Sequence, residues 1–326
     1  MRINIDKRRA AAFLTFSGLF VAAIVVAAND DMTPSEWLDR MDGAVQTINY
    51  EGTVVREKDR KLETFEVVHT VTDGVVREKV IFKDGNGLEI IRNGNEVHCI
   101  FPDRESVLVE EWNDQSTLFS TLPSSDIQFG SEYDVSIVDF ERIAGRKAVA
   151  LAIRPHDNYR YGHRVWLDVK TGFPLQTQLI GDGGEPLEQV KFADIRIDAA
   201  ISPNALTSSY STEGWKWFTQ PQKRARQEVD APWISDNVPA GFRVVSTHQE
   251  SLSDDSSTVI HILYSDGLAS VSVFVAPSGG KKKSKRSSAG ASNSYTTENG
   301  DFIVTAVGEV PWATVEQIAE SMRLNQ

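Results

Sequence analysis

Short β-rich runs separated by turn dipeptides fill most of the first two thirds of the chain, and they constrain the fold more than any other feature. The dipeptides are Asp73-Gly74, Asp84-Gly85, Asn93-Gly94 and Asp182-Gly183. Such a dipeptide between two apolar runs favours a tight β-hairpin, since Asn, Asp and Gly tolerate the positive φ that the turn requires. A succession of hairpins predicts a meandering antiparallel sheet.

The expected strands show partial alternation of apolar and polar residues. They cover residues 50–55, 61–70, 75–82, 88–91, 96–101, 106–110, 133–140, 147–154, 163–168, 175–180 and 187–192. A sheet with so many strands must curl or split. We therefore expect an α+β fold built on a strongly curved antiparallel sheet.

A helix is predicted directly before this sheet. Thr33-Pro34-Ser35-Glu36 is a capping-box pattern with Pro at the first helical position. The residues that follow form one apolar helical stripe: Trp37, Leu38, Met41, Ala44, Val45 and Ile48. The simplest architecture that buries this stripe is one helix lying across the curved sheet.

The strand pattern stops between Tyr210 and Asp230, where three aromatic residues precede a polar and basic run. The aromatic residues are Trp215, Trp217 and Phe218, and the run is Gln220-Pro221-Gln222-Lys223-Arg224-Ala225-Arg226-Gln227. We interpret residues 215–232 as a linker. It separates a large domain, residues 29–214, from a small domain, residues 233–326.

The small domain is predicted to contain strands over residues 242–249, 256–264, 269–275 and 302–308, followed by a helix. Thr314 is expected to cap that helix with Gln317 completing a capping box, and the apolar stripe is Val315, Ile318, Ala319 and Met322. Residues 279–294 are rich in Gly, Ser and Lys, which favours a disordered loop between the last two strands.

The N-terminus has the layout of an export signal. Arg2, Lys7, Arg8 and Arg9 precede an uncharged stretch from residue 10 to residue 28 that ends in Val-Ala-Ala. This arrangement predicts a signal peptide over residues 1–28, cleaved after Ala28. The alternative is an uncleaved membrane anchor, because the apolar stretch just reaches spanning length. The residue directly after the cleavage point is Asn29 and not Cys, which disfavours a lipoprotein, and we expect a periplasmic protein.

The charge balance excludes one class of partner. The chain has a formal net charge of -12, and residues 1–28 hold four basic residues and one acidic residue, so 30 basic and 45 acidic residues follow them. General nucleic-acid binding needs a basic face and is therefore disfavoured. Cys99 is the one cysteine, so no intramolecular disulfide can form.

No catalytic or metal-binding pattern stands out. The six histidines, at 69, 98, 156, 163, 248 and 261, lack ligand spacing. His98 and Cys99 are adjacent in a predicted strand, where successive side chains point to opposite faces. A Gly-x-Ser-x-Gly elbow is also missing from the sequence. We predict no enzyme, no catalytic residue, no metal and no cofactor.

Two basic segments are candidates for lipid or anion binding. The first contains Arg160 and Arg164 within the aromatic stretch from Tyr159 to Trp166, and an ordinary hairpin is the favoured alternative there. The second is the cation run of Lys281, Lys282, Lys283, Lys285 and Arg286. This run could bind phosphorylated lipid head groups or an acidic partner, or it could simply keep the loop in solvent.

Several segments share their residues with one known family. In the large domain they are VWLDVKTGFPL at 165–175 and GGEPLEQ at 183–189; in the small domain they are VPAGF at 238–242, LYSDGLASVSV at 263–273, VGEVP at 307–311 and IAES at 318–321. These segments resemble the sigma-E regulator family RseB/MucB in one consistent order along the chain.

The resemblance implies a fold and a function. It implies a large domain similar to the lipoprotein carriers LolA and LolB, with helices on the concave side of a curved antiparallel sheet, and a smaller C-terminal α/β domain. The implied partner is the periplasmic part of a membrane-spanning anti-sigma factor of the RseA/MucA type. Binding would shield that factor from regulated proteolysis and keep the extracytoplasmic stress sigma factor inactive, and lipopolysaccharide would release it.

The rival hypothesis is a periplasmic lipid or lipoprotein carrier, which the large-domain fold alone would allow. The small domain favours the regulator, because a dedicated carrier needs only the large domain. On this basis the small domain is expected to supply the partner contacts, with Trp233, Phe242, Tyr264, Ser265, Asp266 and Gly267 as candidates. The sequence leaves the oligomeric state open, a homo-oligomer included.

Overall fold

The computed structural model describes residues 32–111, 132–198, 200–219, 227–230, 232–251, 258–278 and 284–325. The predicted signal peptide, residues 1–28, lies outside them. Residues Met32–Gln326 cluster as one compact unit. In the part of the chain that is described, neither helix is both long and apolar enough to cross a membrane.

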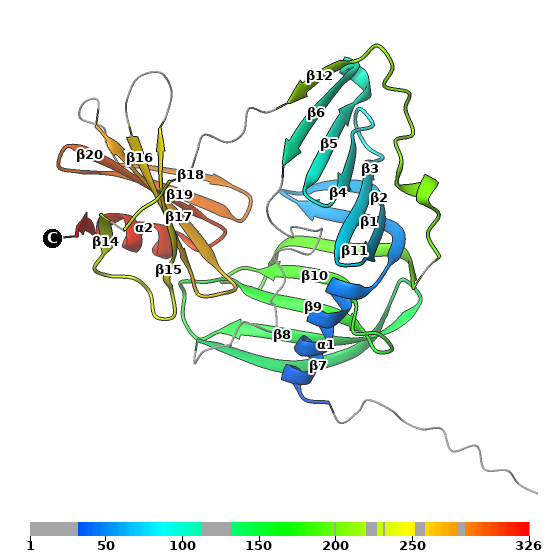
Figure 1. Ribbon diagram of the computed structural model, residues 1–326. Helices are drawn as coiled ribbons and strands as arrows, with labels where there is room; N and C mark the ends of the chain where they lie inside the picture. The colour runs from blue at the N-terminus through cyan, green and yellow to red at the C-terminus, as the bar shows by residue number, and fades with distance from the viewer. Residues whose placement is uncertain are drawn as a thin grey trace, which may run out of the picture. The chain divides into compact units, whose positions relative to one another are not determined.

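The first sheet has 12 strands in the order β12-β6-β5-β4-β3-β2-β1-β11-β10-β9-β8-β7. Its strands are β1 (Tyr50–Lys58), β2 (Lys61–Thr72), β3 (Val75–Phe82), β4 (Glu89–Asn93), β5 (Glu96–Phe101), β6 (Ser106–Glu111), β7 (Tyr133–Ile143), β8 (Arg146–Pro155), β9 (Gly162–Asp168), β10 (Pro174–Ile180), β11 (Pro186–Ile197) and β12 (Lys216–Thr219). Strands β7–β10 and strands β1–β6 run in clearly different directions (Figure 1), so the sheet is strongly bent. The predicted curved meander is confirmed.

Helix α1 (Pro34–Thr47) packs on one face of this sheet and begins where the sequence predicts. Thr33 Oγ1 accepts a hydrogen bond from Glu36 N at 3.3 Å, and Glu36 Oε2 accepts one from Thr33 N at 2.7 Å. This reciprocal capping box satisfies two backbone donors that have no partner within the helix. The buried residues of α1 contact inward side chains of β8, β9 and β1, including Val149, Val165 and Tyr50.

The second sheet has seven strands in the order β13-β15-β16-β17-β20-β19-β18. They are β13 (Gln227–Glu228), β15 (Arg243–Ser251), β16 (Thr258–Ser265), β17 (Ser270–Pro277), β18 (Lys285–Ala289), β19 (Ser292–Asn299) and β20 (Phe302–Gly308). Helix α2 (Trp312–Glu320) covers one face through Val315, Ile318 and Ala319. A short pair, β14 (Trp233–Ser235) and β21 (Met322–Leu324), closes this core.

Part of the predicted linker belongs to the two sheets. Strand β12 pairs in parallel with β6, from Lys216 with Ser106 to Thr219 with Val109, and so extends the large sheet beyond residue 214. At the other end, Gln227 and Glu228 pair with β15. Backbone hydrogen bonding to an open sheet edge has overridden the linker-like composition. Residues 220–226 lie outside the described residues.

The predicted disordered loop over residues 279–294 is too long. Residues 285–289 and 292–299 form the hairpin β18–β19, and β19 pairs with β20 along its length. Composition failed here because β18 is an edge strand with five exposed residues, so it needs no apolar alternation. Strand β19 is anchored instead by the buried side chains of Asn293 and Tyr295.

The predicted cap of the second helix is also wrong. Helix α2 begins at Trp312, with Pro311 in the N-cap position and no side-chain cap. Thr314 lies inside the helix and is fully buried, and its hydroxyl donates to Tyr159 O. A tertiary contact therefore uses the hydroxyl that the sequence pattern assigned to the cap.

Two glycines provide a matched test of the fold. A Cβ added at Gly52 would lie 2.3 Å from Asp194 O, where β1 approaches the bulge of β11, whereas nothing lies within 4 Å of a Cβ added at Gly43 in α1. We expect Gly52→Ala to lower the free energy of unfolding by about 1–3 kcal/mol through overpacking. Gly43→Ala should raise it by about 0.5–1 kcal/mol through helix propensity. Urea denaturation of both variants tests this, and equal effects would contradict it.

Candidate functional site

The loop between β8 and β9 connects the two sheets through side chains and backbone groups. Asn293 Nδ2 donates to Tyr161 Oη at 3.1 Å and to Val310 O at 2.8 Å. Thr314 Oγ1 donates to the backbone oxygen of Tyr159. The loop from a hairpin of the large sheet is therefore fixed by β19 and α2 of the small one.

Arg160 is the central residue of this loop. Its side chain has an exposed fraction of 0%, and its Nε atom lies 3.3 Å from Asp266 Oδ2 and 3.6 Å from Asp157 Oδ1. Nη2 donates to Ala240 O at 2.5 Å. The guanidinium also lies over the rings of Tyr133 and Phe242, with its carbon 5.4 Å and 5.0 Å from their centroids. A buried Arg charge is tolerated because carboxylates and aromatic faces compensate it.

Asp266 is held in place from its own turn. Its Oδ1 accepts backbone hydrogen bonds from Leu268 at 2.9 Å and Ala269 at 2.7 Å. Its Oδ2 accepts the hydroxyl hydrogen bond of Tyr133 at 2.8 Å. Burial and the nearby Asp266 carboxylate raise the pKa of Tyr133, so the phenol remains a donor. The carboxylate is thus fixed before Arg160 contacts it.

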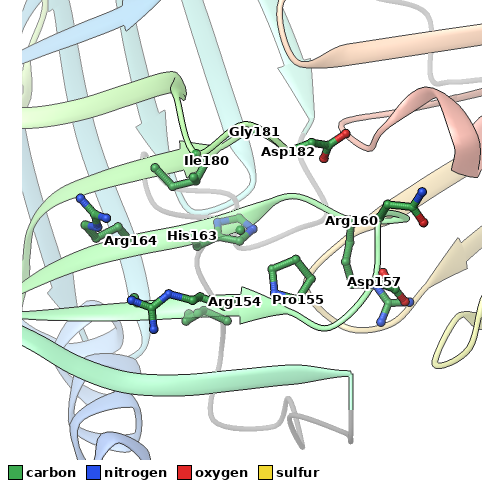
Figure 2. A pocket seen from close by; sticks show the side chains of 14 residues that line it. Arg154, Pro155, Asp157, Arg160, His163, Arg164, Ile180, Gly181 and Asp182 are labelled. Carbon is green, nitrogen blue, oxygen red and sulfur yellow. The ribbon is translucent and has the colours of Figure 1, made fainter.

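A pocket of about 350 Å³ opens beside this loop, at the ends of β8, β9 and β10. Figure 2 shows that Arg154, Arg160, His163 and Arg164 surround it, with Asp157 and Asp182 toward one side. Arg154 Nη1 donates to Ser136 Oγ at 2.9 Å, and Nε of Arg164 is buried without a hydrogen-bond partner. Nε and Nη1 of Arg160 are likewise buried without a hydrogen-bond partner, although Asp266 and Asp157 lie close to this guanidinium.

His163 makes this region sensitive to acid. Burial lowers its pKa to about 4, against the opposing attraction of Asp266. Because the unfolded chain binds this proton near the ordinary pKa of 6.5, the stabilising effect of a neutral His163 is fully present above pH 6.5 and is lost as the pH falls toward 4. We expect His163→Gln to flatten this part of a plot of unfolding free energy against pH. Equal slopes for the wild type and His163→Gln between pH 4 and 6.5 would contradict this prediction.

The structure places the predicted partner-binding residues in two environments. Trp233, Phe242 and Tyr264 are buried in the core of the small sheet. Ser265, Asp266 and Gly267 form the turn after β16, where Gly267 N donates to Ser265 Oγ at 2.9 Å. The first three side chains therefore support the fold. Contact of this turn with a partner stays a prediction.

The predicted lipid- or anion-binding residues are not brought together. Arg160 and Arg164 both line the pocket beside the β8–β9 loop. Lys285 and Arg286 lie on β18, where Arg286 forms an ion pair with Glu316 and its carbon lies 5.5 Å from the ring centroid of Trp312. Lys281, Lys282 and Lys283 lie outside the described residues. Lipid binding by the cation run stays a prediction.

Within the described part of the chain, no group of three or more His, Cys, Asp or Glu side chains is arranged so that it could hold a metal ion. Cys99 is a free thiol whose pKa burial and Glu110 raise to about 11. A thiol with so high a pKa is a poor nucleophile at neutral pH.

The contacts made by Tyr133, Asn293 and Thr314 could not be predicted from the sequence, because each depends on a residue far along the chain.

Comparison with known proteins gives matches over nearly the whole chain. The family model of the MucB/RseB N-terminal domain matches residues 33–210, and that of the MucB/RseB C-terminal domain matches residues 227–323. The sigma factor AlgU regulatory protein MucB of Pseudomonas aeruginosa is 32% identical over 97% of this chain and 98% of that protein. The sigma-E factor regulatory protein RseB of Escherichia coli K12 is 25% identical over 94% of this chain and 96% of its own.

Solved structures agree with these matches. MucB in complex with MucA(peri) has a TM-score of 0.71 at 31% identity, covering 90% of this chain and 100% of that one. A crystal structure of MucB has a TM-score of 0.56 at 30% identity, covering 90% of this chain and 98% of that one. Both domains of the relatives are therefore present here, in the same order and fold. The chain belongs to the MucB/RseB family, whose members include regulators of the sigma factors AlgU and sigma-E.

Proposed function

We propose that this protein is a periplasmic regulator that binds the periplasmic part of a membrane-spanning anti-sigma factor. The observation that carries the proposal is its likeness, in sequence and fold, to MucB, which has been solved in complex with MucA(peri). The export-signal pattern at residues 1–28 supports a periplasmic location. In its bound state the protein shields the anti-sigma factor from regulated proteolysis and so keeps the stress sigma factor inactive.

Binding and shielding are tested together with the chain from residue 29, which contains the whole compact unit. Isothermal titration calorimetry with the periplasmic segment of the anti-sigma factor from the same organism should show saturable binding. Adding the protein should also slow cleavage of that segment by a regulated envelope protease. Failure to bind would contradict the proposal, and binding without slower cleavage would remove the shielding role.

We further propose, from the resemblance to the MucB/RseB family, that lipopolysaccharide releases the complex. Such release requires that lipopolysaccharide bind the free protein more tightly than the complex. The five-cation variant, with Lys281, Lys282, Lys283, Lys285 and Arg286 changed to Ser, should lose release more than partner affinity. Its control changes five exposed cations elsewhere to Ser: Arg60, Lys61, Arg142, Lys147 and Arg243. Equal release by both variants would mean that the cation run has no specific role in release and only keeps the loop in solvent.

The carrier hypothesis predicts a different result from the same protein. A carrier would transfer lipid or an acylated protein between vesicles and would not bind the anti-sigma segment. Vesicle transfer without partner binding would therefore replace the regulatory proposal. The small domain, which the MucB/RseB C-terminal match covers, supports the regulator.

A further inference from the structure

A second cavity lies on the large sheet, on the face opposite helix α1. It has a volume of about 720 Å³ and lies between strands β2–β5 and the segment 200–217. This segment, which runs from β11 to β12 past the short helix η2 (Pro203–Leu206), can be followed along the sheet in Figure 1. We call it the strap. The volume is in the range of small-molecule sites.

The register of the strands shows that the cavity residues on the sheet, which form the floor of the cavity, lie on the face that points away from helix α1. Tyr50, which packs with the α1 core, is paired with His69, so the next residue of β2, Thr70, faces the other way. Thr70 is paired with Arg77, and Arg77 with Asn93. All three line the cavity. The cavity is therefore separate from the core under α1 and from the pocket beside Arg160.

A buried ion pair fixes the strap over this floor. Lys79 Nζ lies 3.7 Å from Glu89 Oε1, and the two side chains have exposed fractions of 7% and 1%. Lys79 Nζ donates to Thr207 O at 2.7 Å and to Ser209 Oγ at 2.9 Å. Glu89 Oε2 accepts from Ser208 Oγ at 3.0 Å and from Ser209 N at 3.1 Å. The cavity is thus preformed by charge-assisted bonds.

The cavity wall combines polar residues with apolar side chains from both the sheet and the strap. Ile91 and Ile100 lie on the floor, and Ile201 and Leu206 belong to the strap. Trp217 of β12 also lines the cavity, and its ring contacts the His98 ring edge-on with 5.6 Å between centroids. Trp217 keeps an exposed fraction of 52%, which is large for an aromatic side chain on an edge strand. An apolar ligand chain placed here would bury it.

One rim of the cavity carries a cation without an acidic partner. Among the described residues, Arg77 forms one side-chain hydrogen bond, from Nε to Asn93 Oδ1 at 3.2 Å, and no ion pair. The nearest acidic group on the same row of the sheet, Glu96, has its Oε1 2.9 Å from His98 Nε2. Glu96 also lines the cavity, but its carboxylate is paired with His98 and not with Arg77. Its guanidinium has free donors for an anion.

We propose that this cavity binds a small amphiphile with one apolar chain and one anionic head group. The head group accepts hydrogen bonds from Arg77, and the chain lies along Ile91, Ile100 and Leu206 toward Trp217. The apolar side chains of Ile91, Ile100 and Leu206 offer a surface for the chain, and Arg77 offers a positive charge for the head group. The site goes beyond the proposed binding of an anti-sigma factor and does not depend on it.

The test titrates the chain from residue 29 with four probes of equal chain length, using calorimetry and Trp fluorescence. Decanoate and monodecyl phosphate carry anionic heads and distinguish a carboxylate from a phosphate. Decylammonium and 1-decanol carry a cationic and a neutral head. We expect the anionic probes to bind and to quench Trp fluorescence, and the other two to bind at least tenfold more weakly.

Two variants locate the site. Arg77→Gln should weaken binding of the anionic probes about tenfold, the effect of one charge-assisted hydrogen bond, and should leave 1-decanol unaffected. Ile91→Ser should weaken the binding of all four probes. Arg142→Gln removes an exposed Arg that donates to Gly145 O far from the cavity, so it should behave as wild type. Equal affinity of wild type and Arg77→Gln for decanoate, or no binding by wild type, would overturn the proposal.

Discussion

Changing Asp266 to Asn should lower the free energy of unfolding by about 3 kcal/mol. The substitution keeps the shape of the side chain and its Oδ1 acceptor for the backbone of Leu268 and Ala269. It removes the negative charge nearest to the guanidinium of Arg160, whose side chain is fully buried. Asp157, at 3.6 Å, is then the one remaining carboxylate partner among the described residues, and its side chain is 28% exposed. A buried cation left with one weak partner is costly.

The matched control is Asp236→Asn, which removes the same charge from an ion pair with Arg323. That pair lies on the surface, with side-chain exposed fractions of 49% and 55%, so solvent screens it. Urea denaturation followed by Trp fluorescence should show a clear loss of stability for Asp266→Asn and almost none for the control. Equal curves would mean that Arg160 does not depend on Asp266.

The same variant separates two roles of Asp266. If the residue acts through Arg160, then Asp266→Asn should also increase hydrogen exchange in the β8–β9 loop, including residues 159–161. If it contacts the anti-sigma factor instead, partner affinity should fall while the loop stays protected. Measuring exchange and affinity on one preparation shows which role holds.

Changing Lys79 to Met should lower the free energy of unfolding by about 3–5 kcal/mol, because it leaves Glu89 buried without its cation. The strap also loses two hydrogen bonds, from Lys79 Nζ to Thr207 O and to Ser209 Oγ. Hydrogen exchange should therefore increase over residues 200–212 more than in β2 or β3. Calorimetric unfolding and exchange mass spectrometry measure the two effects.

A double variant provides the control for this prediction. Lys79→Met combined with Glu89→Leu replaces both charges by apolar groups, which is often nearly neutral for a buried pair. It should recover most of the stability lost in Lys79→Met while the strap still exchanges fast, because its bonds to both side chains are gone. Recovery of strap protection in the double variant would show that other contacts hold the strap.

The strands and the first helix were predictable because their signals are local. Strands β3, β5 and β20 have the predicted bounds of 75–82, 96–101 and 302–308. Asp73-Gly74 has positive φ at both residues, as the predicted hairpin turn requires. Burial on one face and turn geometry both leave a pattern over a few neighbouring residues.

The missed elements lie where distant segments complete a sheet. Strands β12 and β13 occupy edges, and β12 exists because β6 offers backbone groups to Lys216–Thr219. Strand β18 has five exposed residues and so carries no apolar alternation. In these places backbone pairing supplied by another part of the chain decided the structure, and composition suggested a linker or a loop.

The sequence by itself determined the strand pattern, the capped first helix and the membership in a family, since these rest on local periodicity and on motifs in a fixed order. Tertiary structure alone decided which charges are buried together. Arg160 meets Asp266, and Lys79 and Glu89 meet the strap, through contacts between segments far apart in the chain. From sequence alone a charged residue is predicted to lie on the surface, because the partners that make its burial tolerable are supplied only by the surrounding fold.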